Sequence, residues 1–61
     1  MLDDLSRAQF YREQAENLSR MAALEEDEAL RKSLLALANQ YERLRDKHLA
    51  LAASKRTRNS N

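Results

Sequence analysis

The sequence predicts an all-α protein: an antiparallel two-helix hairpin that is expected to dimerise into a four-helix bundle. The 61 residues include no glycine, no proline and a single β-branched residue, Thr57, and they are rich in the strong helix formers Ala, Leu, Arg, Glu, Lys and Gln. Apolar residues recur at helical spacing in two stretches that are out of phase with each other. Charge is divided as well, because residues 1–28 carry a net −5 and residues 29–61 a net +6. The two halves therefore attract each other, which favours a hairpin.

The first helix is expected over residues 4–24. Ser6 and Gln9 match a capping box, and Leu5 and Phe10 stand where a hydrophobic staple belongs. Asp3 is the alternative N-cap, for an earlier start. Apolar residues then follow at heptad spacing: Ala8, Tyr11, Ala15, Leu18 and Ala22.

The second helix is expected over residues 28–53, after a turn at about 25–27. Continuing the first stripe past Ala22 leads to Glu25 and Lys32, so one straight helix would lose its apolar seam there. The acidic run 25–28 suits the positive N-terminal end of a new helix, with Asp27 as its N-cap. The stripe of the second helix is longer than that of the first: Leu30, Leu34, Leu37, Tyr41, Leu44, His48 and Leu51.

Folding the chain at this turn pairs small residues of the first helix with large ones of the second. Such complementary volumes let two helices approach closely. Positions that sum to 56 are Ala22–Leu34, Ala15–Tyr41 and Ala8–His48, and positions that sum to 55 are Leu18–Leu37 and Tyr11–Leu44. The last segment, 54–61, is basic and has no apolar residue, which predicts a disordered tail.

A hairpin of this length leaves part of its apolar surface uncovered. Small domains need an additional stabilising device, and without cysteine the remaining one is oligomerisation. Beside the main stripe we expect Leu35, Ala38, Leu49 and Ala52 to stay uncovered and to receive a partner. A homodimer is favoured, while a trimer or a heteromeric partner stays open. The complete predicted interface is Leu30, Leu34, Leu35, Leu37, Ala38, Tyr41, Leu44, Leu49, Leu51 and Ala52.

The residues that carry catalysis or bind metals are scarce. We predict that the protein is not an enzyme, and we expect no cofactor and no metal. His48 is the only imidazole, and Arg45 occupies the position that a Glu-x-x-His metal motif gives to glutamate. The acidic run 25–28 has neither the alternating oxygen ligands nor the glycine of a calcium loop, so it suits a solvated turn better than a cation site.

One side of the first helix carries residues that suit RNA. Arg7, Phe10 and Gln14 combine a cation, an aromatic ring and an amide, which can grip a phosphate and stack on a base. The alternative is that Phe10 only packs against Leu5. The basic tail is expected to solubilise the chain rather than to bind nucleic acid.

Two resemblances follow from these residues. The pattern from Tyr11-Arg12 through Asp27 to Tyr41-Glu42 and Leu44 resembles a group of short uncharacterised alphaproteobacterial proteins, and this implies a helical hairpin over about residues 10–45. The stretch 8–14, Ala-Gln-Phe-Tyr-Arg-Glu-Gln, is similar to the RNA-facing segment of the Rop-type plasmid regulators, which are dimeric helical hairpins. That resemblance implies an RNA-facing role for Phe10 and Gln14.

These observations favour a non-enzymatic interaction protein, a regulator or scaffold that acts as a homodimer and binds a protein partner. The alternative is an RNA-binding regulator of Rop type. The acidic start of the chain does not match a signal peptide, and no apolar run approaches membrane-spanning length. We therefore expect a cytoplasmic protein with no membrane contact.

Overall fold

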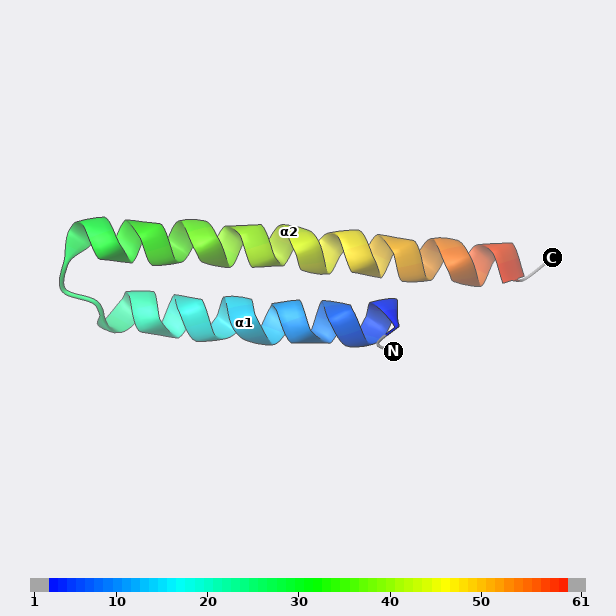
Figure 1. The fold of residues 1–61 in the computed structure, drawn as a ribbon, viewed down its shortest axis with the longest axis horizontal. Helices are drawn as coiled ribbons and strands as arrows, with labels where there is room; N and C mark the ends of the chain where they lie inside the picture. The colour runs from blue at the N-terminus through cyan, green and yellow to red at the C-terminus, as the bar shows by residue number, and fades with distance from the viewer. Residues whose placement is uncertain (1–2, 60–61) are drawn as a thin grey trace.

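The computed structural model is a hairpin of two antiparallel α-helices (Figure 1). It describes the backbone of residues 3–59 and the side chains of residues 3–55. Helix α1 spans Asp4–Leu24 and helix α2 spans Glu28–Asn59, and the described part of the chain has no strand. The molecule is a rod of 52 × 16 × 15 Å, so each helix has the other as its only neighbour.

Helix α1 begins one turn earlier than the capping box predicted. Asp3 is the N-cap, and its carboxylate accepts a hydrogen bond of 2.8 Å from the backbone N–H of Ser6. This bond lowers the pKa of Asp3. The prediction of Ser6 as N-cap is therefore wrong, and the alternative, Asp3, is correct. A carboxylate beside the positive helix end explains the preference.

The turn between the helices is built from acidic side chains rather than from glycine. Glu25 ends α1 with an extended backbone (φ −84°, ψ 126°), and its N–H donates to the carbonyl of Ala22. The Glu25 carboxylate accepts the N–H of Asp27, and the Asp27 carboxylate accepts the N–H of Leu30, each at 3.0 Å. No described residue has a positive φ, so this turn has no position that demands glycine.

The Asp27 cap gives a first testable prediction. Replacing Asp27 with alanine removes the acceptor for the Leu30 N–H, and we expect the free energy of unfolding to fall by about 0.5–2 kcal/mol. Urea titration followed by circular dichroism measures the change. Glu26→Ala is the matched control, because no hydrogen bond of Glu26 holds the turn; an equal loss in both variants would contradict the role of the cap.

Helix α2 continues to Asn59 rather than ending near residue 53. The prediction of a disordered tail from residue 54 is thus wrong for residues 54–59, while residues 60–61 lie outside the described chain. Two physical effects favour the longer helix. Lys55 is tied to Asp4 of α1 by an ion pair, and basic residues interact favourably with the negative C-terminal end of a helix. As a result α2 projects beyond the start of α1 (Figure 1).

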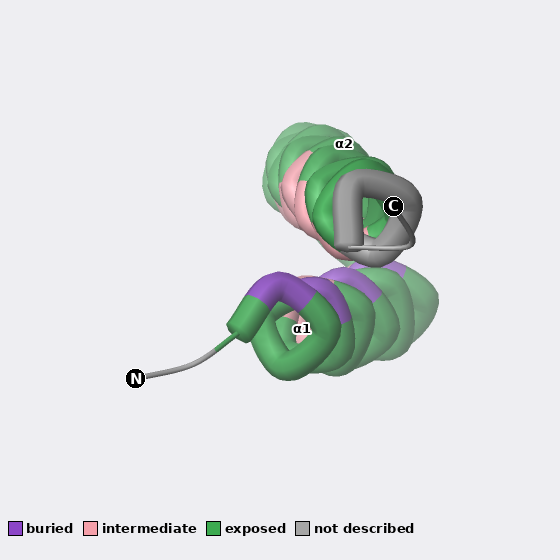
Figure 2. Tube along the Cα trace, turned by 90° about the vertical axis from the view of Figure 1, so that its right-hand side faces the viewer, coloured by how far each residue is buried: buried purple, intermediate pink, exposed green. Residues whose placement is uncertain are grey.

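The core between the helices consists of alanine. Ala8, Ala15 and Ala22 are 1–4% exposed and lie seven residues apart, so they form one line along α1 that faces α2 (Figure 2). Across from them only Ala38 of α2 is buried to the same degree among the described residues. Small side chains on both helices allow close approach of the backbones.

The seam of α2 differs by one residue per heptad from the predicted stripe. Leu34, Tyr41 and His48 lie in the seam as predicted, and all three are half-buried. Between them the structure places Ala38, Arg45 and Ala52, which are buried or half-buried, where the prediction had Leu37, Leu44 and Leu51. Leu37, the predicted partner of Leu18, is 40% exposed and lies at the edge of the seam. The small side chains of Ala38 and Ala52 suit a seam in which α1 presents its alanine line.

Aromatic rings stack within the seam. The ring of Tyr11 is stacked between Tyr41 (centroids 5.8 Å apart) and His48 (5.4 Å). Tyr11 thus lies at the level of residues 44 and 45, midway between its two ring partners. The predicted position of Tyr11 opposite Leu44 along the hairpin is thus right. Its ring, however, stacks on Tyr41 and His48, which lie on either side of that position.

Candidate interaction faces

Helix geometry gives the hairpin two different long faces. Seven residues make nearly two turns, so residues at that spacing form a line along a helix. On α2 one such line flanks the seam on each side. The first line is Leu30, Leu37, Leu44 and Leu51, and the second is Leu35, Glu42 and Leu49.

The first line forms what we call the leucine face, defined by Leu30, Leu37, Leu44 and Leu51 of α2. Leu30, Leu37 and Leu51 are 40–49% exposed, and Leu44 is half-buried. On the same side of the seam, α1 contributes the line Arg7, Gln14 and Met21, with Met21 54% exposed. Four leucines in line with no charge between them are an apolar surface that lacks a cover.

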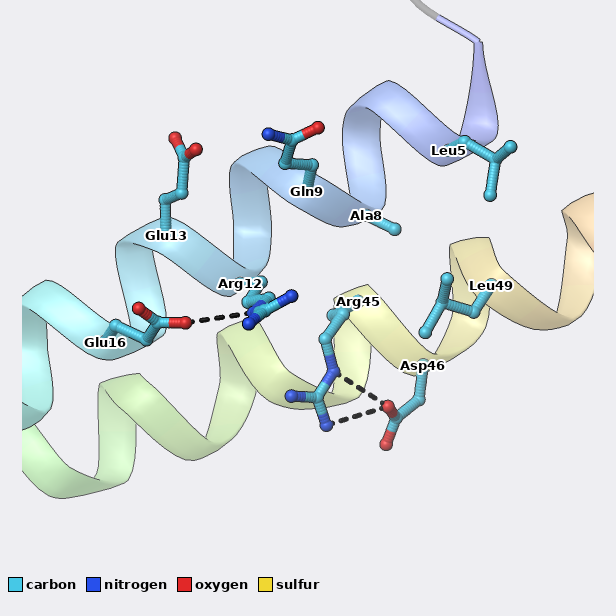
Figure 3. Close-up of a pocket in the computed structure, with 9 residues that line it drawn as sticks. All are labelled: Leu5, Ala8, Gln9, Arg12, Glu13, Glu16, Arg45, Asp46 and Leu49. Atoms are coloured by element: carbon cyan, nitrogen blue, oxygen red, sulfur yellow. Dashed lines mark hydrogen bonds and ion pairs between the residues drawn. The ribbon is translucent and has the colours of Figure 1, made fainter.

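The second line borders what we call the charged groove, a hollow of about 840 Å³ between the two helices. Figure 3 shows Leu5 and Leu49 at one end, with the ion pairs Arg12–Glu16 and Arg45–Asp46 along it. Each pair lies within one helix, so the groove is not closed by any bond across it. Arg45 holds a seam position, and its guanidinium reaches out to Asp46, as long cationic side chains commonly do.

The predicted interface residues are thereby divided among three places. Leu30, Leu37, Leu44 and Leu51 lie on the leucine face, with Leu34 and Tyr41 half-buried beside them. Leu35 and Leu49 are 44% exposed and lie on the other flank of the seam, where Leu49 lines the charged groove. Ala38 and Ala52 belong to the seam, so the prediction that they stay uncovered is wrong. Of the leucines assigned to the seam, Leu30, Leu37 and Leu51 are instead exposed.

The predicted RNA-binding residues are brought together only in part. Arg7 and Phe10 line a small hollow with Tyr11 and His48, whereas Gln14 is half-buried and lies outside that hollow. Phe10 is 49% exposed, and its ring packs edge-on against Tyr11 at 5.7 Å. Leu5, the alternative partner of Phe10, lines the charged groove.

A buried polar cluster closes the open end of the hairpin. The Asp4 carboxylate, 6% exposed, lies 2.9 Å from His48 Nδ1 and 2.5 Å from Lys55 Nζ. Asp4 lies four residues before Ala8, one turn earlier on the same face of α1. This spacing could have identified Asp4 from the sequence as a residue of the seam. Hydrogen bonds from Lys55 and His48 lower the pKa of Asp4. His48 is therefore a satisfied end-layer residue with a side chain 12% exposed.

This cluster makes the stability of the hairpin depend on acid. Because the folded chain holds the pKa of Asp4 below its usual 3.8, the Asp4 contribution is complete above that pH and is lost as the pH falls through the lower, folded value. We expect Asp4→Asn to lower the melting temperature at pH 7 and to have little effect at pH 2. Thermal unfolding of both chains from pH 7 to pH 2 measures this difference.

Asp46→Asn is the control for that series, because the Asp46 carboxylate is 65% exposed and pairs only with its neighbour Arg45. Exposed pairs of this kind contribute about 0–1 kcal/mol. If Asp4→Asn and Asp46→Asn gave the same melting temperatures at every pH, the buried cluster would have no stabilising role.

The hairpin exposes more surface than a compact protein of its mass. A folded chain of 7.1 kDa is expected to expose about 4,100 Å², whereas this one exposes 4991 Å². The excess of about 900 Å² is close to the roughly 800 Å² that each partner contributes to a stable interface of ordinary size. The surface that a partner needs is therefore present.

Two further searches of the described residues found neither a group of three or more His, Cys, Asp or Glu able to hold a metal ion nor a helix long and apolar enough to cross a membrane. Comparison of the chain with protein-family models, with curated proteins and with solved structures found no match. The two faces of the hairpin are therefore the features that bear on function.

Proposed function

We propose that the chain is a non-enzymatic interaction protein, a regulator or scaffold that forms a homodimer through its leucine face and binds a protein partner. The observation that carries the proposal is the line Leu30, Leu37, Leu44 and Leu51, which the hairpin leaves open beside its own seam. Two hairpins joined in this way make a four-helix bundle.

The energy available from this face is of the right size. Covering the exposed part of one such leucine contributes about 2 kcal/mol, so three leucines on each of two copies contribute roughly 12 kcal/mol. Association costs about 4–15 kcal/mol. Met21 and the half-buried Tyr41 add apolar area on the same side, so the apolar gain is comparable to the cost of association.

In such a dimer the charged groove stays accessible, since it lies on the other side of the seam. It offers one apolar end, formed by Leu5 and Leu49, and the ion pairs Arg12–Glu16 and Arg45–Asp46 along it (Figure 3). This combination suits a helical or extended protein segment that brings both apolar and charged groups. The groove is therefore the surface that we assign to the protein partner.

Sedimentation equilibrium of the chain at micromolar concentration tests the proposal. We expect the mass of a dimer, with dissociation on dilution. A folded, monodisperse monomer at high micromolar concentration would overturn it.

An RNA-binding regulator is the second candidate function, and one observation favours it. Arg7 and Phe10 line one hollow, with the Phe10 ring half exposed. If RNA is the ligand, Phe10→Ala combined with Gln14→Ala is expected to weaken binding of structured RNA at least tenfold, since stacking on one aromatic ring contributes about 1–3 kcal/mol. Filter binding at fixed salt measures this.

Gln9→Ala is the control for the RNA experiment, because Gln9 lines the charged groove instead. Circular dichroism confirms that each variant folds. Equal RNA binding by the folded double variant and by wild type would remove this second candidate.

A further inference from the structure

We infer that the leucine face binds a second copy of itself in antiparallel orientation, with Leu30 against the second copy's Leu51 and Leu37 against the second copy's Leu44. This inference depends on the proposed homodimer and adds its geometry. Three independent observations on the described residues support it: the spacing of the leucines, the charges near the ends of α2, and the level of the matching line on α1.

The spacing of the leucines is symmetric. Reversing the line 30, 37, 44, 51 about its midpoint, between residues 40 and 41, reproduces the same line. A twofold interface requires such self-complementarity, because each residue pair occurs twice. The other flank fails this requirement, since the line Leu35, Glu42 and Leu49 has a carboxylate at its midpoint. Antiparallel pairing there would bring two Glu42 side chains together.

Charge favours the antiparallel orientation over the parallel one. The turn and the start of α2 carry four consecutive acids, 25–28. Antiparallel pairing places this run beside the C-terminal part of the second copy's α2, where Lys55 is 67% exposed and Arg56 follows in the sequence. Parallel pairing would bring acid against acid at one end and Lys47 against Lys47 farther along. The antiparallel arrangement also opposes the two helix dipoles.

The line on α1 agrees with the same twofold axis. Tyr11 lies between Tyr41 and His48, so Gln14, three residues farther along α1, lies at about the level of Tyr41. That level is the midpoint of the leucine line. Gln14 is also the midpoint of Arg7, Gln14 and Met21, so in the dimer Gln14 faces its own copy and Arg7 lies beside the second copy's Met21. One twofold axis therefore passes through the midpoint of the leucine line on α2 and the midpoint of the line Arg7, Gln14 and Met21 on α1.

Cysteine cross-linking tests the orientation, and the chain suits it because it contains no cysteine. Ser33, Gln40 and Lys47 are exposed residues spaced seven apart along the outer edge of the leucine face. Each is replaced singly by cysteine, and each full-length variant is checked for helicity and treated with a short bifunctional maleimide. In the antiparallel dimer Gln40→Cys is expected to link to itself, whereas Ser33→Cys alone and Lys47→Cys alone are not.

An equal mixture of Ser33→Cys and Lys47→Cys supplies the decisive comparison. We expect its yield of covalent dimer to exceed that of either variant alone by at least tenfold. Efficient self-linking of all three single variants would indicate a parallel dimer and overturn the inference. A sedimenting dimer that links at neither Gln40→Cys nor the mixture would overturn the inference while leaving the homodimer intact, and a monomer by sedimentation would overturn the proposed function itself.

Discussion

Leu37→Glu is expected to convert the dimer into a monomer. Leu37 is 40% exposed in the hairpin, so the substitution leaves the contacts between α1 and α2 in place. In the proposed dimer it removes two buried leucines and brings two carboxylates into an apolar layer. Losing about 1.5–3 kcal/mol at each copy weakens association by roughly 10²–10⁴-fold. Sedimentation velocity across a concentration series measures this change.

Leu35→Glu is the matched control for that experiment. Leu35 is 44% exposed, which is nearly the same as Leu37, and it lies two residues away on the same helix. It lies on the opposite flank of the seam from Leu37, in line with Glu42 and Leu49, where another carboxylate stays solvated. We expect Leu35→Glu to sediment as wild type does. Equal dissociation constants for the two variants would show that the leucine face has no special role in association.

Ala15→Leu is expected to cause the largest loss of hairpin stability. Ala15 is 4% exposed and is the middle member of the alanine line. Three added carbon atoms have no space there, so the helices must separate or α1 must rotate. Overpacking of this kind costs about 1–3 kcal/mol, which is a large share of the roughly 3–5 kcal/mol that so small a core supplies. We expect the melting temperature to fall by about 10 °C or more.

Ala23→Leu is the control that distinguishes a packing effect from a change in helix propensity. Ala23 is exposed on the same helix, and leucine is almost as good a helix former as alanine. We expect this control to unfold at the wild-type temperature in a calorimetric or circular dichroism scan. If Ala15→Leu were as stable as Ala23→Leu, the close approach of the two helices at Ala15 would be wrong.

The sequence alone was enough for the helices and their order. Helix formers without glycine or proline predict the helices, and the phase change after Ala22 predicts the hairpin. These are local properties: propensity, capping and periodicity act within one or two turns of the chain. The alanine line of α1 was also readable, because its seven-residue spacing has no competing choice.

The face of α2 was not decided by the sequence. Leu37 and Ala38 are adjacent, and both fit a heptad that includes Leu34 and Tyr41. Periodicity favoured the larger residue for the seam. In the structure Ala38 is buried in the seam and Leu37 is 40% exposed. A preference of this kind depends on the distance between two helices, which no single helix specifies.

The same division applies to the ends of the hairpin. The sequence by itself determined two helices, an acidic turn and a surplus of apolar side chains, since each follows from residue type and spacing. Only the tertiary structure decided that Asp4 meets His48 and Lys55, which carries α2 past its predicted end. The tertiary structure also decided that Leu30, Leu37 and Leu51 are exposed. Which residues of α2 face α1 depends on how the two helices pack, and not on the sequence of either helix alone.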